Sequence, residues 1–186
     1  MANIFKNIGN LKSTTDRLRN AVRDVENFPS EGVVFKDITP LLNDPQLFRL
    51  SISLLADRYQ RMRIDKVMAI DARGFLFGSA LAYVLGTGVA IARKKGKLPW
   101  ETIEASYDLE YGSNTIEIHK DAVLSGERVL VVDDVLATGG TLKATIDLVQ
   151  ELGGEVVESA VIIELLFLNG AEKIKPSPLY SLIDYS

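Results

Sequence analysis

Two short apolar runs that flank a helical stretch constrain the fold of this chain more than any other feature. The runs KVMAID (Lys66–Asp71) and GVAIAR (Gly88–Arg93) have the length of strands, and the stretch RGFLFGSALAYVLG between them reads as a helix that ends at Gly86. A strand, a helix and a second strand in this order form a parallel pair with a right-handed crossover. The pattern therefore predicts an α/β sheet.

The rest of the chain continues this alternation. Further strands are predicted at Arg128–Val132 and Val156–Leu166, and further helices at Thr14–Asn27 (with Ser13 and Thr14 as N-caps), Gln46–Arg61 and Thr141–Leu152. The segment FPSEGVVFKDITPLLNDP is expected to be a loop with short extended pieces, and the stretch from 93 to 123 a long loop or hairpin whose TIEI piece alternates like an exposed strand. We expect one domain over residues 1–186, built on an open, mainly parallel sheet with helices on both faces.

Composition narrows the classes of partner. The chain has 186 residues, of which 47% are hydrophobic, and a net charge of −4, so it can bury a core but has no overall basic field for nucleic acid. It has no cysteine, which excludes disulfides and thiolate chemistry and is compatible with a reducing, cytoplasmic location. No apolar run is long enough to span a membrane. We expect neither a nucleic acid nor a membrane as partner, and any anion site must come from local clusters.

The stretch VLVVDDVLATGGTLKA (Val129–Ala144) carries the strongest local signal. Paired glycines after a strand let the backbone approach a ligand, and the helix that follows offers unpaired N–H groups. Hydroxyl groups of Thr138 and Thr141 add donors. The loop therefore predicts a cradle for a monophosphate, although an ordinary turn with capping threonines would also fit. It is neither a Walker P-loop nor a Rossmann fingerprint, because neither spacing occurs in the chain.

Two charged clusters lie near the same predicted edge of the sheet. Asp133 and Asp134 are like charges side by side, which is unfavourable unless ribose hydroxyls or a magnesium ion face them. Four cations occur within five residues at Arg93–Lys97, and Arg73 follows another strand. In an acidic chain these cations favour an anion site, while a solvated surface pair of acids and a solvated basic loop remain the alternatives.

Together these motifs resemble those of a known family. VVDDVLATGGT is similar to the phosphoribosyl-pyrophosphate motif of the type I phosphoribosyltransferases. FPSEGVVFKDITPLL, DARGFLFGSALAYVLG, RKKGKLPWETIEASYDLEYG and IEIHKDAV resemble, in order and spacing, the adenine phosphoribosyltransferases of that family. The resemblance runs from about Leu18 to Tyr185. It implies the type I fold with a small hood at about 28–45 and a mobile catalytic loop or hairpin at about 96–120.

The resemblance also implies a reaction and a set of site residues. The reaction makes AMP and pyrophosphate from adenine and 5-phosphoribosyl-1-pyrophosphate with Mg2+, in a homodimer. The implied roles are 5′-phosphate binding by Ala137, Thr138, Gly139, Gly140 and Thr141; ribose and magnesium contact by Asp133 and Asp134; pyrophosphate binding by Asp71, Ala72, Arg73, Gly74, Arg93, Lys94 and Lys97; adenine binding by Val34, Phe35 and Lys36; and acid/base catalysis by Glu110, with Tyr111 beside it. Arg93 is also a candidate to reach the site of a dimer partner.

Two positions depart from the family pattern, and other functions compete. Lys36 stands where arginine is common, and Ala72 where serine is often seen. The competing functions are a phosphoribosyltransferase for 6-oxopurines, a regulator that binds the pyrophosphate donor without catalysis, and a generic nucleotide-binding module. The hood around Phe35 argues against the first, and the catalytic loop argues against the second.

Overall fold

The computed structural model describes residues 11–108 and 113–186, and the chain divides into two compact units at Leu54/Leu55. In the first unit, helix α1 (Leu11–Arg19) is followed by strands β1 (Arg23–Glu26) and β2 (Val34–Asp37) and by helix α2 (Thr39–Asn43). β1 and β2 form an antiparallel pair. Helix α3 (Pro45–Tyr59) starts in this unit and ends in the second.

The second unit is built on a seven-stranded sheet with the order β5-β6-β4-β3-β7-β8-β9. Its strands are β3 (Lys66–Ile70), β4 (Gly88–Lys94), β5 (Thr102–Asp108), β6 (Ser113–His119), β7 (Arg128–Leu136), β8 (Glu155–Leu165) and β9 (Leu179–Tyr185). The neighbours in the run β4-β3-β7-β8-β9 pair in parallel, while β6 is antiparallel to both β4 and β5. The predicted open, mainly parallel sheet is confirmed.

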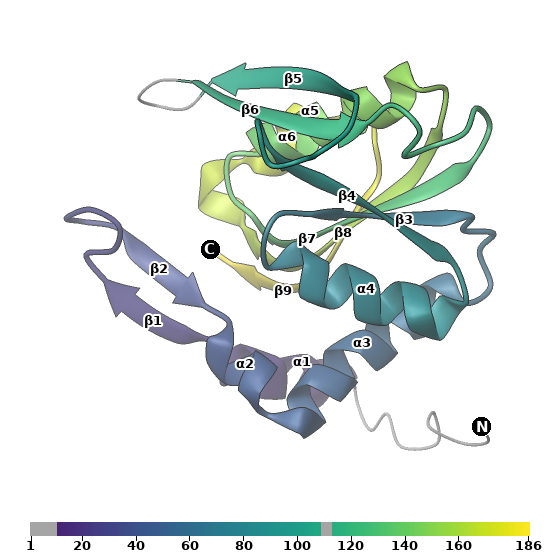
Figure 1. Cartoon of the computed structure of the whole chain (residues 1–186). Coiled ribbons are helices and arrows are strands. Elements are labelled where there is room, and N and C mark those ends of the chain that lie inside the picture. Colours follow the sequence, from purple (N-terminus) through teal and green to yellow (C-terminus); the bar gives the residue numbers. More distant parts are fainter. Residues whose placement is uncertain (1–10, 109–112) are drawn as a thin grey trace. The chain divides into compact units, whose positions relative to one another are not determined.

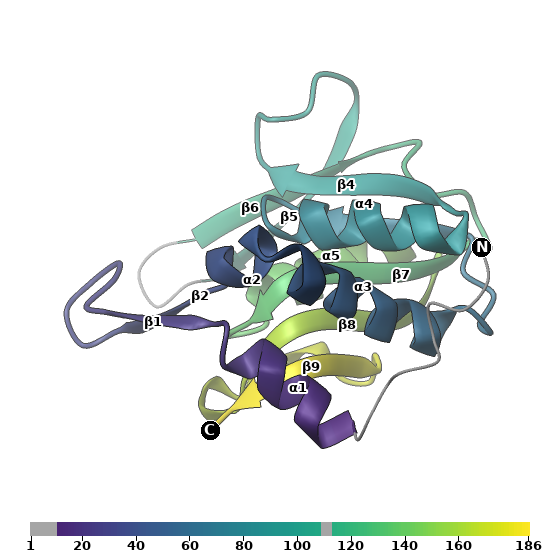
Figure 2. The same cartoon turned by 90° about the horizontal axis from the view of Figure 1, so that it is seen from below.

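Helices cover both faces of this sheet (Figures 1 and 2). Helix α4 (Gly74–Leu85) packs so closely on β3 that a Cβ at Gly78 would lie 2.6 Å from Ala69 Cβ. Helix α5 (Gly140–Glu151) buries Leu142 and Ile146 with Met68 and other apolar residues of the opposite face. Because both faces are covered, the central strands are continuously apolar, as KVMAI is. The unit also contains the short helices η1 (Leu166–Leu168) and α6 (Gly170–Ile174).

A buried ion pair joins the end of α3 to the sheet. Glu158 on β8 accepts hydrogen bonds from Arg58 Nε at 2.6 Å and from the Tyr59 hydroxyl at 2.6 Å. The Arg58 guanidinium also lies over the ring of Tyr180, 4.2 Å from its centroid. Burial alone would raise the pKa of Glu158, but the hydrogen bonds from Arg58 and Tyr59 outweigh it and lower that pKa. The pair is therefore charged at neutral pH.

Three expectations about elements were wrong. The helix predicted over Thr14–Asn27 ends at Arg19, because the residues that follow pair with β2 instead; Ser13 and Thr14 lie inside α1 rather than at its cap. The TIEI piece is a strand, but Ile116, Glu117 and Ile118 are all buried. β7 continues to Leu136, so Asp133 and Asp134 lie within the strand and not after it.

The other predicted strands and helices are confirmed to within a few residues. The segment at 28–45, predicted as a loop with short extended pieces, contains strand β2 and also helix α2. The helix that follows the first strand ends at Gly86, whose φ of 72° is the left-handed conformation that glycine adopts most readily. Among residues 11–108 and 113–186, no helix is long and apolar enough to cross a membrane.

Candidate active site

Three loops with polar side chains follow β3, β4 and β7, which are neighbours in the sheet. Two of these loops are held together by hydrogen bonds. The Asp71 N–H donates to the Ala92 carbonyl at 2.9 Å, and Arg93 Nε donates to Asp71 Oδ2 at 3.1 Å. The peptide bond between Asp71 and Ala72 is cis. The carboxyl ends of parallel strands meet at one edge of a sheet, which is where ligands bind in such folds.

The two adjacent acids have different environments. Asp134 is buried and accepts a hydrogen bond from Arg73 Nε at 2.5 Å. Asp133 Oδ1 accepts the backbone N–H of Asp134 at 2.8 Å. Burial and the neighbouring charge of Asp134 raise the pKa of Asp133 well above its ordinary value. Arg73 therefore offsets the repulsion between the two acids only in part: its charge also lowers the pKa of Asp133, but burial and Asp134 outweigh it.

Gly74 lets the start of α4 approach β7. A Cβ at this position would lie 2.9 Å from the Val132 carbonyl oxygen and 3.0 Å from Asp133 Oδ1. Any larger residue would push the loop at 71–74 away from the two acids. The glycine is therefore required by contacts within the chain, whatever ligand it also approaches.

The predicted phosphate cradle lies at the start of α5. Gly139 is the N-cap, with a φ of 78° and no side-chain capping hydrogen bond. The first N–H groups of a helix have no acceptor within the helix, so those of α5 can donate to an anion at its N-terminus. A Cβ at Gly139 would lie 2.5 Å from the Gly170 carbonyl oxygen, and one at Gly170 would overlap the Ala137 carbonyl oxygen. The start of α6 thus packs directly against the predicted phosphate loop.

A tyrosine on the β5–β6 hairpin contacts the same cradle. The Thr141 hydroxyl donates to the Tyr107 hydroxyl at 2.8 Å. The Tyr107 ring lies against Gly140, where an added Cβ would be 2.7 Å from Cδ2. Figure 1 shows this hairpin beside α5. Sequence reasoning missed both Tyr107 and Gly170, because each acts through a neighbour that is distant in the chain.

Two of the four cations in the basic cluster form ion pairs with acids, and the other two are exposed. Arg93 pairs with Asp71, and Lys95 pairs with Glu104 at 2.8 Å. Lys94 and Lys97 are exposed and form no ion pair with the residues that the structure describes. These two are the lysines that the family resemblance assigns to pyrophosphate.

The residues predicted to bind adenine lie in the first unit, on β2. The Phe35 ring packs edge-on against Phe28, with centroids 5.2 Å apart, and Lys36 Nζ pairs with Asp24 at 2.7 Å. Lys36, which stands where the family commonly has arginine, is thus paired with an acid on β1.

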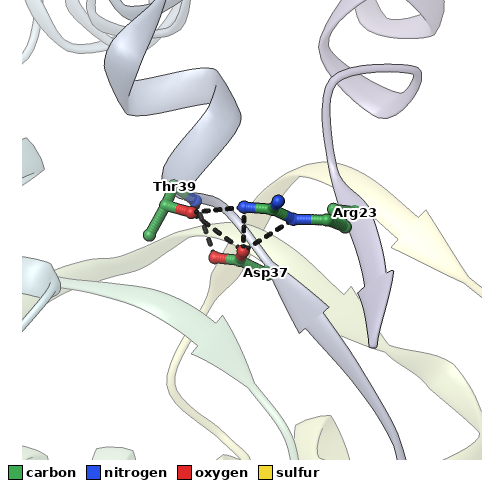
Figure 3. A network of polar contacts seen from close by, with 3 residues as sticks. All are labelled: Arg23, Asp37 and Thr39. Carbon is green, nitrogen blue, oxygen red and sulfur yellow. Dashed lines mark hydrogen bonds and ion pairs between the residues drawn. The ribbon is translucent and has the colours of Figure 1, made fainter. Parts of the chain in front are cut away.

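A polar network fixes the end of this hairpin (Figure 3). Asp37 accepts hydrogen bonds from Arg23 Nη2 at 2.8 Å and from the Thr39 backbone N–H at 2.9 Å. Burial would raise the pKa of Asp37, but the hydrogen bonds from Thr39 and Arg23 lower it overall. The network joins β1, β2 and the start of α2 in one arrangement.

Glu110 and Tyr111 lie outside the described residues. Among the described residues, no cluster of three acidic or histidine side chains is placed to hold a metal. Asp133 nevertheless fits a magnesium site in chemistry, because it offers hard carboxylate oxygen in a position where a cation would offset its raised pKa.

These observations define a class: a mainly parallel α/β sheet with a glycine-rich loop at the start of α5, an acid pair (Asp133 and Asp134) and a basic turn (Arg93–Lys97) at one edge. Residues 37–180 match the family model described as the phosphoribosyl transferase domain. The chain therefore belongs to the phosphoribosyl transferase family.

Within that family the chain is similar to adenine phosphoribosyltransferases. The protein of this name from Desulfosudis oleivorans is 55% identical over 168 residues, which cover 90% of this chain and 97% of that protein. The structure of the enzyme from Thermoanaerobacter pseudethanolicus has a TM-score of 0.90 and 47% identity, covering 92% of this chain and 99% of that one. The Saccharomyces cerevisiae enzyme, solved with adenine and an imino-altritol bisphosphate, has a TM-score of 0.87 and 39% identity, covering 92% and 99%.

Proposed function

We propose that this chain transfers the 5-phosphoribosyl group of 5-phosphoribosyl-1-pyrophosphate to adenine, giving AMP and pyrophosphate in purine salvage. One observation carries the proposal: two ion pairs connect the 71–74 loop to the rest of the site. Asp71 pairs with Arg93 of the basic turn, and Arg73 pairs with Asp134 of the acid pair. The names of the relatives supply the base, adenine.

Binding of the donor divides between two parts of the site. The N–H groups at the start of α5 and the hydroxyls of Thr138 and Thr141 receive the 5′-phosphate. Lys94, Lys97 and Arg73 face the pyrophosphate, with Ala72 and Gly74 supplying backbone contacts. Asp133 and Asp134 face the ribose hydroxyls. Arg93 holds Asp71 within its own chain, and its proposed reach into a partner's site would require it to leave that ion pair.

The chemical step is a displacement at the anomeric carbon. A nitrogen of adenine bonds to this carbon while the bond to pyrophosphate breaks, through a transition state in which the sugar is positively charged. Cations near the leaving pyrophosphate would stabilise this transition state, and electrostatic contributions of this kind are typically about 3–4 kcal/mol per well-placed donor. Magnesium, held mainly by substrate and water with Asp133 and Asp134 nearby, supplies further charge neutralisation when bound. Glu110 accepts or relays the proton that adenine loses, and Phe35 stacks on the base.

The test is release of pyrophosphate by the purified protein with magnesium and 5-phosphoribosyl-1-pyrophosphate, offered adenine, hypoxanthine, guanine and uracil in parallel. We expect release with adenine alone. Release with a 6-oxopurine would keep the reaction and change the substrate. Binding of the donor without release for any base would favour the non-catalytic regulator.

We also propose that the protein acts as a homodimer in the cytoplasm. The absence of cysteine from the sequence is compatible with the location. The apolar side chains that α4 exposes, among them Tyr83, support the dimer.

A further inference from the structure

Glu117 is a buried carboxylate behind the basic turn. It lies on β6, is 4% exposed, and is opposite Arg93 in the pairing of β6 with β4. A buried carboxylate is unfavourable unless hydrogen bonds replace its lost hydration. Glu117 Oε1 accepts the backbone N–H groups of Lys97 and Leu98, each at 2.9 Å. The side chain therefore caps the turn between β4 and β5 from within.

The hydrogen bonds decide the charge of this group. Burial alone would raise the pKa of Glu117, but N–H groups of Leu98, Gly96 and Lys97 lower it overall. The carboxylate is ionised at neutral pH, and charge-assisted hydrogen bonds of this kind are about twice as strong as neutral ones.

Lys97 is held on both sides of its backbone. Its N–H is bound by Glu117, and its carbonyl oxygen accepts a hydrogen bond from Arg93 Nη1 at 3.0 Å. Arg93 is in turn fixed by Asp71, which lies in the neighbouring loop. The position of Lys97 relative to the loop at 71–74 is thus set by a chain of contacts that starts at Glu117.

We propose that Glu117 is a positioning residue for pyrophosphate: it fixes the basic turn so that Lys94 and Lys97 meet the pyrophosphate together. The inference rests on the proposed function, because it assumes that this turn binds the pyrophosphate. Glu117 is buried, so the proposal gives it no contact with substrate. Its effect should be confined to the pyrophosphate half of the donor, because the cradle for the 5′-phosphate is built from α5, α6 and Tyr107.

Two substitutions separate position from charge. Glu117→Asp keeps the charge but shortens the side chain by one methylene, so its oxygen cannot reach both N–H groups without displacing the turn. Glu117→Gln keeps the length and an acceptor oxygen but removes the charge. Glu104→Gln is the matched control, because Glu104 contacts the same turn through Lys95 but is exposed.

The measurement is the Kd of magnesium pyrophosphate and, separately, of ribose 5-phosphate for each variant. We expect Glu117→Asp to weaken pyrophosphate binding by about tenfold, as loss of a charged hydrogen bond predicts. Glu117→Gln should recover most of that affinity. Both variants should bind ribose 5-phosphate within about twofold of the unsubstituted protein, and Glu104→Gln should bind both ligands normally.

Four results would overturn the inference. Unchanged pyrophosphate affinity in Glu117→Asp would show that the turn does not depend on this side chain. An equal loss of affinity for pyrophosphate and for ribose 5-phosphate would show that Glu117 has a general structural role. If the unsubstituted protein bound ribose 5-phosphate but not pyrophosphate, the inference would fall together with the proposed function. Selective loss in Glu104→Gln instead would move the positioning role to Lys95.

Discussion

Thr141 has two hydrogen-bonding roles, one seen in the structure and one proposed. Its hydroxyl donates to Tyr107 at 2.8 Å, and it also lies in the first turn of α5, where the 5′-phosphate is proposed to bind. A phosphate would offer a charged acceptor, and hydrogen bonds to charged groups contribute about 1.5–3 kcal/mol. The phosphate should therefore outcompete the tyrosine for this donor.

Thr141→Val removes the hydroxyl with little change of shape. We expect the Kd of ribose 5-phosphate to rise by about tenfold or more, while the Kd of pyrophosphate stays nearly constant. Titration calorimetry with the two ligands measures both. Tyr107→Phe is the control, since it removes the tyrosine hydroxyl but keeps the Thr141 hydroxyl, which donates to the phosphate. The Kd of ribose 5-phosphate should change much less in this variant. Equal losses in the two variants would mean that Thr141 works only through Tyr107.

The start of α6 packs tightly against the loop that is proposed to bind the 5′-phosphate. Because a Cβ at Gly170 would overlap the Ala137 carbonyl oxygen, Gly170→Ala must displace one backbone from the other. Overpacking of this kind typically costs about 1–3 kcal/mol. We expect a lower midpoint of thermal unfolding together with weaker ribose 5-phosphate binding.

Gly88→Ala is the control for this element. The nearest atom to a Cβ there is Lys66 Cε at 3.8 Å, so the added methyl meets ordinary contact only. Its unfolding midpoint should stay close to that of the unsubstituted protein. If Gly170→Ala behaved like Gly88→Ala, the contact between α6 and the phosphate loop would carry no energetic weight.

Elements whose partners are close in sequence can be predicted, and those with distant partners cannot. The β3-α4-β4 unit and α5 follow from local periodicity and from the glycines at their ends. β1 escapes prediction because Val22 and Val25 are spaced like one face of a helix, and only pairing with β2 makes this segment a strand. β9 similarly depends on pairing with β8, which the local sequence does not show.

The candidate site shows the same division. The segments at 71–74, 93–97 and 133–141 can be located because each lies at or after the end of a strand. The ion pairs that sort the basic turn cannot, since Asp71 and Glu104 lie 22 and 9 residues from their partners. The alternation of TIEI predicts an exposed strand, but Glu117 on this strand is buried. The basic turn supplies its hydrogen bonds, and the local pattern contains no sign of that contact.

At the scale of the whole molecule, helix α4 presents an exposed apolar face. Leu76, Tyr83 and Val84 of α4 are 49%, 83% and 52% exposed, and their spacing of seven and eight residues places them on one face of the helix. Such a face on a globular unit is typical of a protein interface. The proposed homodimer would bury it against a second copy.

Tyr83→Lys tests that assignment, because a lysine placed at a twofold interface introduces two like charges where apolar contact is lost. We expect the dimer Kd to rise by about 30-fold or more, equivalent to about 2 kcal/mol, as measured by sedimentation equilibrium. Leu124→Lys, at a residue that is 63% exposed and outside α4, should leave the dimer intact. An unsubstituted protein that sediments as a monomer at micromolar concentration would refute the dimer. A Tyr83→Lys variant that dimerises normally would instead place the interface elsewhere, since an ammonium group cannot be buried there without loss of affinity.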